Sequence, residues 1–250
     1  RELVENDRII GGISANCSEK VTNLYKIFVN ADCLVTDCRT AELSKLVENS
    51  FRDVNIAYAN ELSLICDKLN INVWKLIKLA NLHPRVDILN PGPGVGGHCI
   101  AVDPWFIIDS APREAKLIHT ARLVNNAKPG FVLDKIQQAI DAIDKDVSDI
   151  KIACLGLSFK PDIDDLRHSP ALNIVENIIL KGFSEVLVVE PNISNLPQEF
   201  KETSASLVSV DKAIEAADIV LLLVDHNSFK SIGLELLSGK QIVDTRGIWS

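Results

Sequence analysis

One cysteine follows directly after a segment rich in glycine and proline. Residues 90–97 read Asn-Pro-Gly-Pro-Gly-Val-Gly-Gly, and His98 and Cys99 come next. No helix or interior strand tolerates this density of glycine and proline, so we predict a loop whose backbone can approach a ligand closely. A thiol carried by such a loop is a candidate nucleophile beside a bound substrate. Without the glycines, Cys99 would more often be a buried structural thiol.

The spacing Gly92-x-Gly94-x-x-Gly97 also fits a dinucleotide fingerprint, which requires a strand before it and a helix directly after it. Residues 98–104 are not expected to begin a helix. Two prolines in the loop also lack the N–H groups that a phosphate nest would use. The pattern therefore favours a loop that contacts a substrate over a dinucleotide site.

A stripe of polar residues lies on the longest helical pattern, which covers residues 40–69, with Thr40 as the expected N-cap. Lys45, Asn49 and Arg52 are spaced at i, i+4 and i+7 and therefore share one helix face. A solvated face is the ordinary explanation, but asparagine is a poor helix former. A helix of this length spans about 45 Å, so we expect it to cross a domain or to pair with a partner chain.

Other patterns predict the elements that surround this helix. We expect a turn at Gly11-Gly12 and a short strand over 33–36. The predicted helices cover residues 21–29, 73–81 with Asn72 as cap, and about 112–143 with an interruption at Pro129-Gly130.

After the charged segment 144–149 the pattern changes to strands that alternate with helices. The predicted strands are apolar throughout and cover residues 151–157, 185–189, 219–224 and 241–243. The predicted helices cover 172–181 and 211–217. This alternation is typical of a parallel α/β sheet, so the chain is predicted to be helical first and α/β second.

Three cations stand near the predicted carboxyl ends of strands, where α/β proteins bind ligands. Lys160 and Arg167 flank the turn after the first strand, and Arg246 follows the last one. They suit a phosphate or a carboxylate, although each alone is as readily a solvated surface charge. Glu190 resembles a ribose-binding acid, but because the first turn lacks the glycine triplet we expect a solvated strand end. Asp162, Asp164 and Asp165 lack the spacing of a calcium loop, so no metal is predicted.

Composition narrows the possible classes of protein. The chain has 250 residues, of which 47% are hydrophobic, and a net charge of -8, which argues against nucleic acid as a partner. No apolar run reaches the length of a membrane span. The six cysteines form no C-x-x-C pair, which favours a reducing, cytoplasmic compartment. Because the chain contains no methionine, we expect it to be a fragment or a processed product.

Four motifs in order resemble the nucleotide-sugar dehydrogenases, which oxidise a UDP-hexose or GDP-hexose at C6. They are Lys45-x-x-x-Asn49, Gly96-Gly97-His98-Cys99-x-x-x-Asp103, Phe159-Lys160-Pro161 and Asp165-x-Arg167-x-Ser169-Pro170. The resemblance implies an α/β protein in two parts. Residues 1–145 would form a helical central dimerisation and catalytic domain with a long connecting helix. Residues 146–250 would form a Rossmann-like parallel α/β domain that binds the UDP-sugar.

The resemblance also implies roles for the matching residues. Cys99 would be the nucleophile and Lys45 the general acid/base, with Asn49 and Asp103 beside it. Arg167 would reach NAD. The UDP-sugar would be held by Arg52, His83, Arg85, Gly96, Phe159, Lys160 and Arg246. Family members pair through the long helix, here residues 40–69, and Arg85 would serve the neighbouring subunit's site.

The implied reaction is a four-electron oxidation of a UDP-N-acetylhexosamine at C6. NAD removes a hydride, the cysteine traps the aldehyde as a thiohemiacetal, a second NAD oxidises this to a thioester, and water releases the carboxylate. Cysteine suits both covalent steps, and a nearby cation such as Lys45 favours the thiolate. The amino-terminal NAD-binding domain of the family has no counterpart here, so we expect a fragment that is inactive alone.

Two alternative functions, from classes other than the dehydrogenases, remain possible. In the first, the chain is a non-catalytic nucleotide-binding or dimerisation module, and Lys45 and Cys99 are structural. In the second, it is a thiol hydrolase that uses Cys99 with His98. The second is disfavoured because adjacent residues on an extended segment point in opposite directions.

Overall fold

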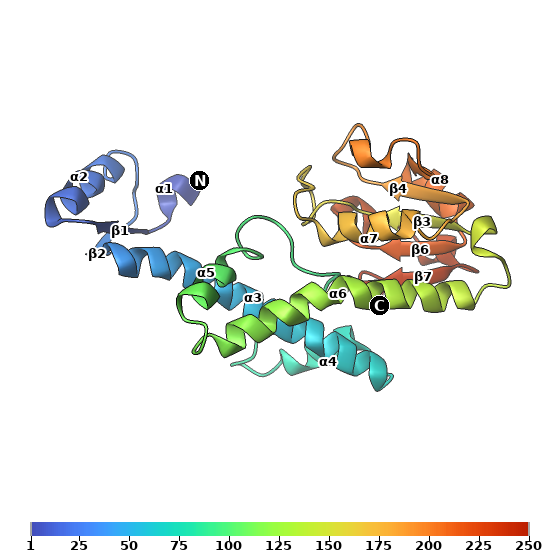
Figure 1. Cartoon of the computed structure of the whole chain (residues 1–250), viewed down its shortest axis with the longest axis horizontal. Coiled ribbons are helices and arrows are strands. Elements are labelled where there is room, and N and C mark those ends of the chain that lie inside the picture. The colour runs from blue at the N-terminus through green and yellow to red at the C-terminus, as the bar shows by residue number, and fades with distance from the viewer. Residues whose placement is uncertain (1, 250) are drawn as a thin grey trace.

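The computed structural model describes residues 2–249 and has the long helix α3 (Cys38–Lys68) near its middle (Figure 1). A small βαβ unit lies at one end of α3, and a parallel sheet lies beyond its other end. The unit contains β1 (Arg8–Gly12), α2 (Ala15–Tyr25) and β2 (Cys33–Asp37), preceded by the one-turn helix α1 (Glu2–Glu5). Strands β1 and β2 pair in parallel.

Two predictions for this unit were wrong. Gly11 and Gly12 end strand β1 instead of forming a turn. A Cβ on Gly11 would overlap Ala41 at the start of α3, and one on Gly12 would overlap Ser18, so the glycines allow close packing of the strand. Helix α2 begins six residues before the predicted start at 21, because the Ser14 side chain accepts a hydrogen bond from the Cys17 N–H and caps it.

Helix α3 confirms the predicted long helix, but its cap is Asp37 and not Thr40. The Asp37 Oδ1 accepts a hydrogen bond from the Thr40 N–H at 2.9 Å. This bond holds the pKa of Asp37 below its usual range. The predicted Asn72 cap is confirmed on α4 (Val73–Ala80).

Helix α6 (Lys116–Asp141) runs without a break through Pro129 and Gly130, so the predicted interruption was wrong. Tertiary packing outweighs the hydrogen bond lost at proline. The first part of α6 pairs with α3 through the buried Arg122 and Asn125, whose side chains bond to Asp53 of α3. Its last part lies under the sheet, so one helix connects both halves (Figure 1).

The expectation that residues 98–104 begin no helix was wrong. Helix α5 (Asp103–Ser110) begins four residues after Cys99, with Pro104 in its first turn, where the missing N–H of proline costs no helical hydrogen bond. The stretch near Pro112 is not helical until Lys116.

The predicted parallel α/β sheet is confirmed and has five strands in the order β5-β4-β3-β6-β7. Ile152 on β3 pairs with Val186 on β4 and with Ile219 on β6. Strand β5 was not predicted because it has only three residues. The strands are β3 (Lys151–Leu155), β4 (Glu185–Val189), β5 (Ala205–Leu207), β6 (Ile219–Leu222) and β7 (Gln241–Asp244).

Helices cover both faces of the sheet and bury its core. On one face, α6 and α7 (Pro170–Ile179) contribute Ile136 and Ile174, both fully buried. On the other face, α8 (Val210–Ala216) packs with Phe229 and Leu237. Four short 3₁₀ turns complete this half: η1 (Val147–Asp149), η2 (Gln198–Phe200), η3 (Asn227–Phe229) and η4 (Leu234–Leu237).

In residues 2–249, no helix is both long and apolar enough to cross a membrane. Over the same residues, no group of three or more His, Cys, Asp or Glu side chains is arranged to hold a metal ion.

Candidate active site

A cavity of about 640 Å³ lies between the helical half and the sheet. The sheet order places β4 and β6 on opposite sides of β3. This creates a crevice at the carboxyl ends of β3 and β6, the usual ligand position in such sheets. The turns after both strands line the cavity, together with residues 89–100 and the α3 side chains Asn49, Arg52 and Ile56. Strands β3 and β6 end at Leu155 and Leu222, two residues before the predicted ends at 157 and 224. The last two residues of each predicted strand belong instead to the turn that follows it.

Cys99 lines this cavity, and its residue is exposed. Its carbonyl oxygen accepts hydrogen bonds from the N–H groups of Val102 at 3.1 Å and Asp103 at 2.8 Å, which close a turn into α5. Cys154 behaves differently: it is completely buried, and burial raises the pKa of its thiol. Of these two thiols, Cys99 is the one that a ligand in the cavity can reach.

Asn49 and Asp103 meet beside the Cys99 turn. Asn49 is buried on α3, and its Nδ2 donates a hydrogen bond to Asp103 Oδ2 at 2.6 Å. This contact ties the start of α5 to α3. It explains why asparagine occupies a helix position for which its propensity is poor.

Lys45 lies one turn before Asn49 on the same face of α3, but it is exposed and does not line the cavity. Its Nζ lies 2.9 Å from Glu48 Oε2, and the two side chains are 65% and 58% exposed. Such a surface pair contributes less than about 1 kcal/mol. The ammonium is therefore weakly held and can leave Glu48 for another partner.

The glycine loop, residues 90–97, packs tightly on both halves of the molecule. The Gly92 N–H donates a hydrogen bond to the buried Asn60 Oδ1 at 2.9 Å. A Cβ on Gly96 would overlap the carbonyl oxygen of His168. A Cβ on Gly97 would lie 2.9 Å from the Phe159 ring, and Gly97 has a φ of +82°, which disfavours any other residue. The glycines therefore let the loop seat against the α/β half.

Three cations line the cavity: Arg52, Lys160 and Arg246. Arg246 Nε donates to Asp225 Oδ1 at 2.7 Å. Within residues 2–249, neither Arg52 nor Lys160 forms an ion pair, and Lys160 Nζ lies 5.9 Å from the centroid of the Phe159 ring. Asp225 is the one carboxylate among the lining residues, so the lining carries a positive formal charge. The chain as a whole has a net charge of -8. The positive lining suits a diphosphate.

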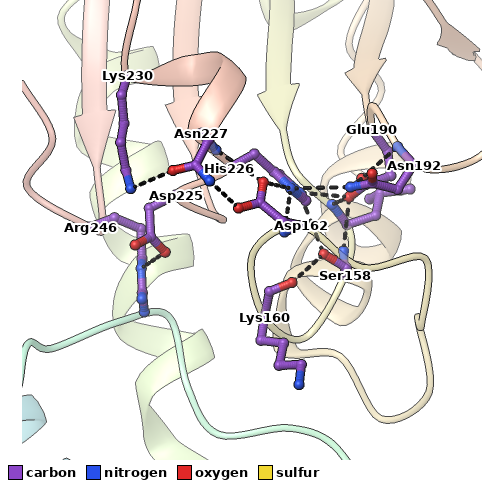
Figure 2. Close-up of polar contacts among 11 residues, drawn as sticks. Ser158, Lys160, Asp162, Glu190, Asn192, Asp225, His226, Asn227, Lys230 and Arg246 are labelled. Atoms are coloured by element: carbon purple, nitrogen blue, oxygen red, sulfur yellow. Dashed lines mark hydrogen bonds and ion pairs between the residues drawn. The ribbon is translucent and has the colours of Figure 1, made fainter. Parts of the chain in front are cut away.

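Glu190 is not the solvated strand end that was predicted, because it is 3% exposed. Its Oε2 accepts hydrogen bonds from the N–H groups of Leu157 at 2.8 Å and Ser158 at 3.1 Å, and it lies 3.1 Å from His226 Nε2 (Figure 2). Burial raises the pKa of Glu190, but these hydrogen bonds outweigh burial, so its pKa lies below the usual range. The carboxylate is thus already occupied by protein donors.

Five predicted site residues do not line the cavity: Lys45, Asp103, His83, Arg85 and Arg167. Asp103 is joined to the lining through Asn49, and Lys45 lies one helical turn from Asn49. His83 and Arg85 are exposed in the turn after α4. Arg167 is exposed and donates two hydrogen bonds to Asp165 at 2.8 and 2.7 Å, which hold the pKa of Asp165 well below its usual range. In one copy of the chain His83, Arg85 and Arg167 do not join the seven predicted residues that line the cavity.

Neither the turn after β3 nor the glycine loop has the features of a dinucleotide site. The turn after β3 lacks a glycine triplet, and Glu190 occupies its first N–H groups. The glycine loop follows no strand, and α5 begins only at Asp103. These residues therefore do not fit the adenine dinucleotide that the family resemblance implies.

Comparisons with known proteins agree with this architecture. The family model of the UDP-glucose/GDP-mannose dehydrogenase central domain matches residues 39–127, and the UDP binding domain of the same family matches residues 153–250. Together they cover most of the chain.

Similar proteins carry related names. An NDP-N-acetyl-D-galactosaminuronic acid dehydrogenase from Ralstonia nicotianae is 57% identical over the whole chain. A UDP-N-acetyl-D-mannosamine dehydrogenase from Yersinia pestis is 56% identical over 99% of it. The chain spans 58% and 60% of the length of these two relatives.

A solved structure of a UDP-D-ManNAc dehydrogenase from Pyrococcus horikoshii superposes with a TM-score of 0.87. It is 39% identical over 99% of this chain and 57% of that one. The chain therefore belongs to the UDP-glucose/GDP-mannose dehydrogenase family, and it contains the family's central and UDP-binding domains.

Proposed function

We propose that this chain forms the substrate-binding and acyl-transfer part of a cytoplasmic, NAD-dependent UDP-N-acetyl-D-mannosamine 6-dehydrogenase. The observation that supports this most is the cavity itself, in which an exposed thiol and three cations surround one ligand-sized space at the β3/β6 crevice. The relatives named for N-acetylmannosamine and N-acetylgalactosaminuronic acid substrates support a UDP-N-acetylhexosamine. UDP-N-acetylglucosamine is the alternative substrate.

In this proposal the diphosphate lies against Lys160 and Arg246. Lys160 brings an unpaired ammonium on the turn after β3, and Arg246 is oriented by Asp225. Arg52 adds a third cation from α3, on the same side of the cavity as Asn49. The sugar then extends toward the glycine loop, where Gly96 allows the backbone to come close and Cys99 follows.

The proposed chemistry oxidises the C6 alcohol to a carboxylate. Two molecules of NAD would supply the oxidising equivalents, each taking one hydride from C6. The Cys99 thiolate adds to the C6 aldehyde carbon to give a thiohemiacetal, holds the carbon as a thioester after the second hydride is removed, and leaves as thiolate when water attacks. Lys45 acts as acid/base and stabilises developing oxyanions once it releases Glu48, while the Asn49–Asp103 pair fixes the geometry beside the sulfur.

His83, Arg85 and Arg167, which do not line the cavity, have proposed roles between subunits or toward the cofactor. Pairing of two copies through residues 40–69 would bring His83 and Arg85 to the neighbouring copy's cavity. Both residues stand in an exposed turn that Asn81 fixes through two hydrogen bonds to Ile88, at 2.9 and 2.8 Å. Arg167 is exposed and close in sequence to the cavity, and we propose that it contacts NAD.

Because neither the turn after β3 nor the glycine loop fits a dinucleotide, we expect the 250-residue chain to bind UDP-sugar without reducing NAD. Calorimetric titration with UDP-N-acetylmannosamine, UDP-N-acetylglucosamine and ADP tests the first part, and NADH absorbance tests the second. Binding of a UDP-sugar but not of ADP supports the proposal. Absence of UDP-sugar binding contradicts it.

Thiol labelling separates the enzyme from a non-catalytic binding module. Cys99 should react with iodoacetamide and be protected by UDP-sugar, while the exposed Cys17 and Cys38 should react equally with and without ligand. Peptide mass spectrometry reads each site separately. A Cys99 that reacts no differently when ligand is bound would favour the binding module.

A further inference from the structure

Three consecutive residues in the segment after β6, Asp225 to Asn227, bond to one residue of the cavity wall and to two residues behind it (Figure 2). Asp225 accepts a hydrogen bond from Arg246. His226 contacts Asp162 and Glu190 on either side of its ring. The N–H of Asn227 donates to Asp162 Oδ1 at 3.1 Å. A lone Asp-His-Asn carries no recognisable sequence pattern, so the sequence alone predicts no role for this segment.

The hydrogen-bond partners of His226 determine which of its nitrogens carries the proton. Nδ1 faces two donors, the N–H of Asp162 at 3.0 Å and the side-chain amide of Asn192 at 3.3 Å, so Nδ1 must accept. The proton of the neutral ring is therefore on Nε2, which donates to Glu190 Oε2 at 3.1 Å. The ring is completely buried and lies edge-on to Phe229, which restricts its orientation.

Through these bonds, His226 and Glu190 fix both ends of the turn 157–162. Glu190 accepts from the N–H groups of Leu157 and Ser158 at the start of the turn, and His226 accepts from Asp162 at its end. Asp162 has a φ of +60°, a conformation that residues other than glycine rarely adopt without external support. The turn is thus held by partners outside it, and its middle carries Phe159 and Lys160 into the cavity.

We propose that His226 is a positioning residue for the UDP-sugar. It holds Lys160 and Phe159 in place through the turn 157–162, while its neighbour Asp225 aligns Arg246, so one short segment sets two of the three cavity cations. This inference rests on the proposed function, because it assigns those cations to the diphosphate.

The test compares His226→Leu, which removes both ring nitrogens, with His226→Asn, whose amide oxygen can still accept from Asp162. Ile178→Ala serves as a matched control, because Ile178 is completely buried in the same half but does not line the cavity. Each variant is titrated with UDP below its melting temperature, and amide hydrogen exchange is read across residues 157–162. If His226→Leu fails to fold, His226→Phe replaces it.

We expect His226→Leu to weaken UDP binding about tenfold or more, because the buried acceptor of the Asp162 N–H is lost. His226→Asn should recover most of the affinity, and Ile178→Ala should lower the melting temperature with UDP binding unchanged. Exchange in the turn should accelerate in His226→Leu and not in Ile178→Ala.

The proposal would be overturned if His226→Leu bound UDP as tightly as the wild type and showed unchanged amide exchange in the turn. It would also be overturned if His226→Leu, His226→Asn and Ile178→Ala all lost the same amount of UDP affinity. If the wild-type chain binds no UDP, the proposed function fails. The exchange comparison then decides alone whether His226 orders the turn.

Discussion

One methyl group added to Gly96 would test whether the glycine loop must seat on the α/β half. A Cβ built there overlaps the His168 carbonyl oxygen and lies 2.7 Å from Pro170 Cδ and 2.9 Å from Phe159 Cβ. A backbone carbonyl and a proline ring cannot rotate away, so in Gly96→Ala the loop itself has to move. Overpacking of this kind costs about 1–3 kcal/mol.

The movement should also affect ligand binding, because Gly96, Phe159 and Cys99 line the same cavity. Urea unfolding followed by tryptophan fluorescence measures the free energy of unfolding, and calorimetry measures UDP affinity. Gly96→Ala should lower both.

Gly130→Ala is the matched control. Gly130 lies within helix α6, and apart from its chain neighbours and its own helix backbone no atom lies within 4 Å of the added Cβ. Alanine should therefore raise the free energy of unfolding by about 0.5–1 kcal/mol and leave UDP affinity unchanged. If Gly96→Ala matches the wild type in both stability and affinity, the loop does not need close contact with the α/β half, and the description of the cavity is wrong.

Three further predictions concern buried charge and the thiol. Burial lowers the pKa of Lys128 from 10.5 to about 8, so the folded chain releases this proton at a lower pH than the unfolded chain. The free energy of unfolding should therefore rise between about pH 8 and 10. Urea unfolding of Lys128→Met over the same pH range should show no such rise. Arg122→Met leaves the carboxylate of Asp53 buried without its cation and should cost about 3–5 kcal/mol by the same measurement; a smaller loss in Arg122→Met than in Val132→Ala would contradict it. In the complete enzyme, Cys99→Ser should abolish NADH production while the calorimetric affinity for UDP-sugar stays unchanged, and unaltered turnover would exclude the thioester route.

Periodicity and caps predicted those parts of the fold that depend on local sequence. The length of α3, the Asn72 cap and the parallel sheet follow from 3.6-residue spacing, side-chain capping and continuous apolar runs. The continuity of α6 through Pro129 could not be predicted, because packing on α3 and on the sheet holds the helix together. The same limit applies to β1, whose glycines meet α2 and α3 only in the folded chain.

The candidate site was predictable to the extent that its residues form motifs. Seven predicted residues line one cavity, namely Asn49, Arg52, Gly96, Cys99, Phe159, Lys160 and Arg246. Asp103 joins them through its bond to Asn49. The burial of Glu190 and the contacts of His226 and Asp225 depend on how β4 and β6 flank β3. No spacing along the chain carries that information.

Helix α6 has a mechanical consequence for the crevice beside it. Residues before Pro129 pack on α3, and residues 132–140 pack under the sheet, although Lys135 still pairs with Asp67 of α3. The two walls of the crevice are therefore connected by one helix. Proline removes one backbone hydrogen bond from that helix at the junction, which weakens it locally. Flexing there would widen or narrow the mouth through which a nucleotide enters, while both interiors keep their packing.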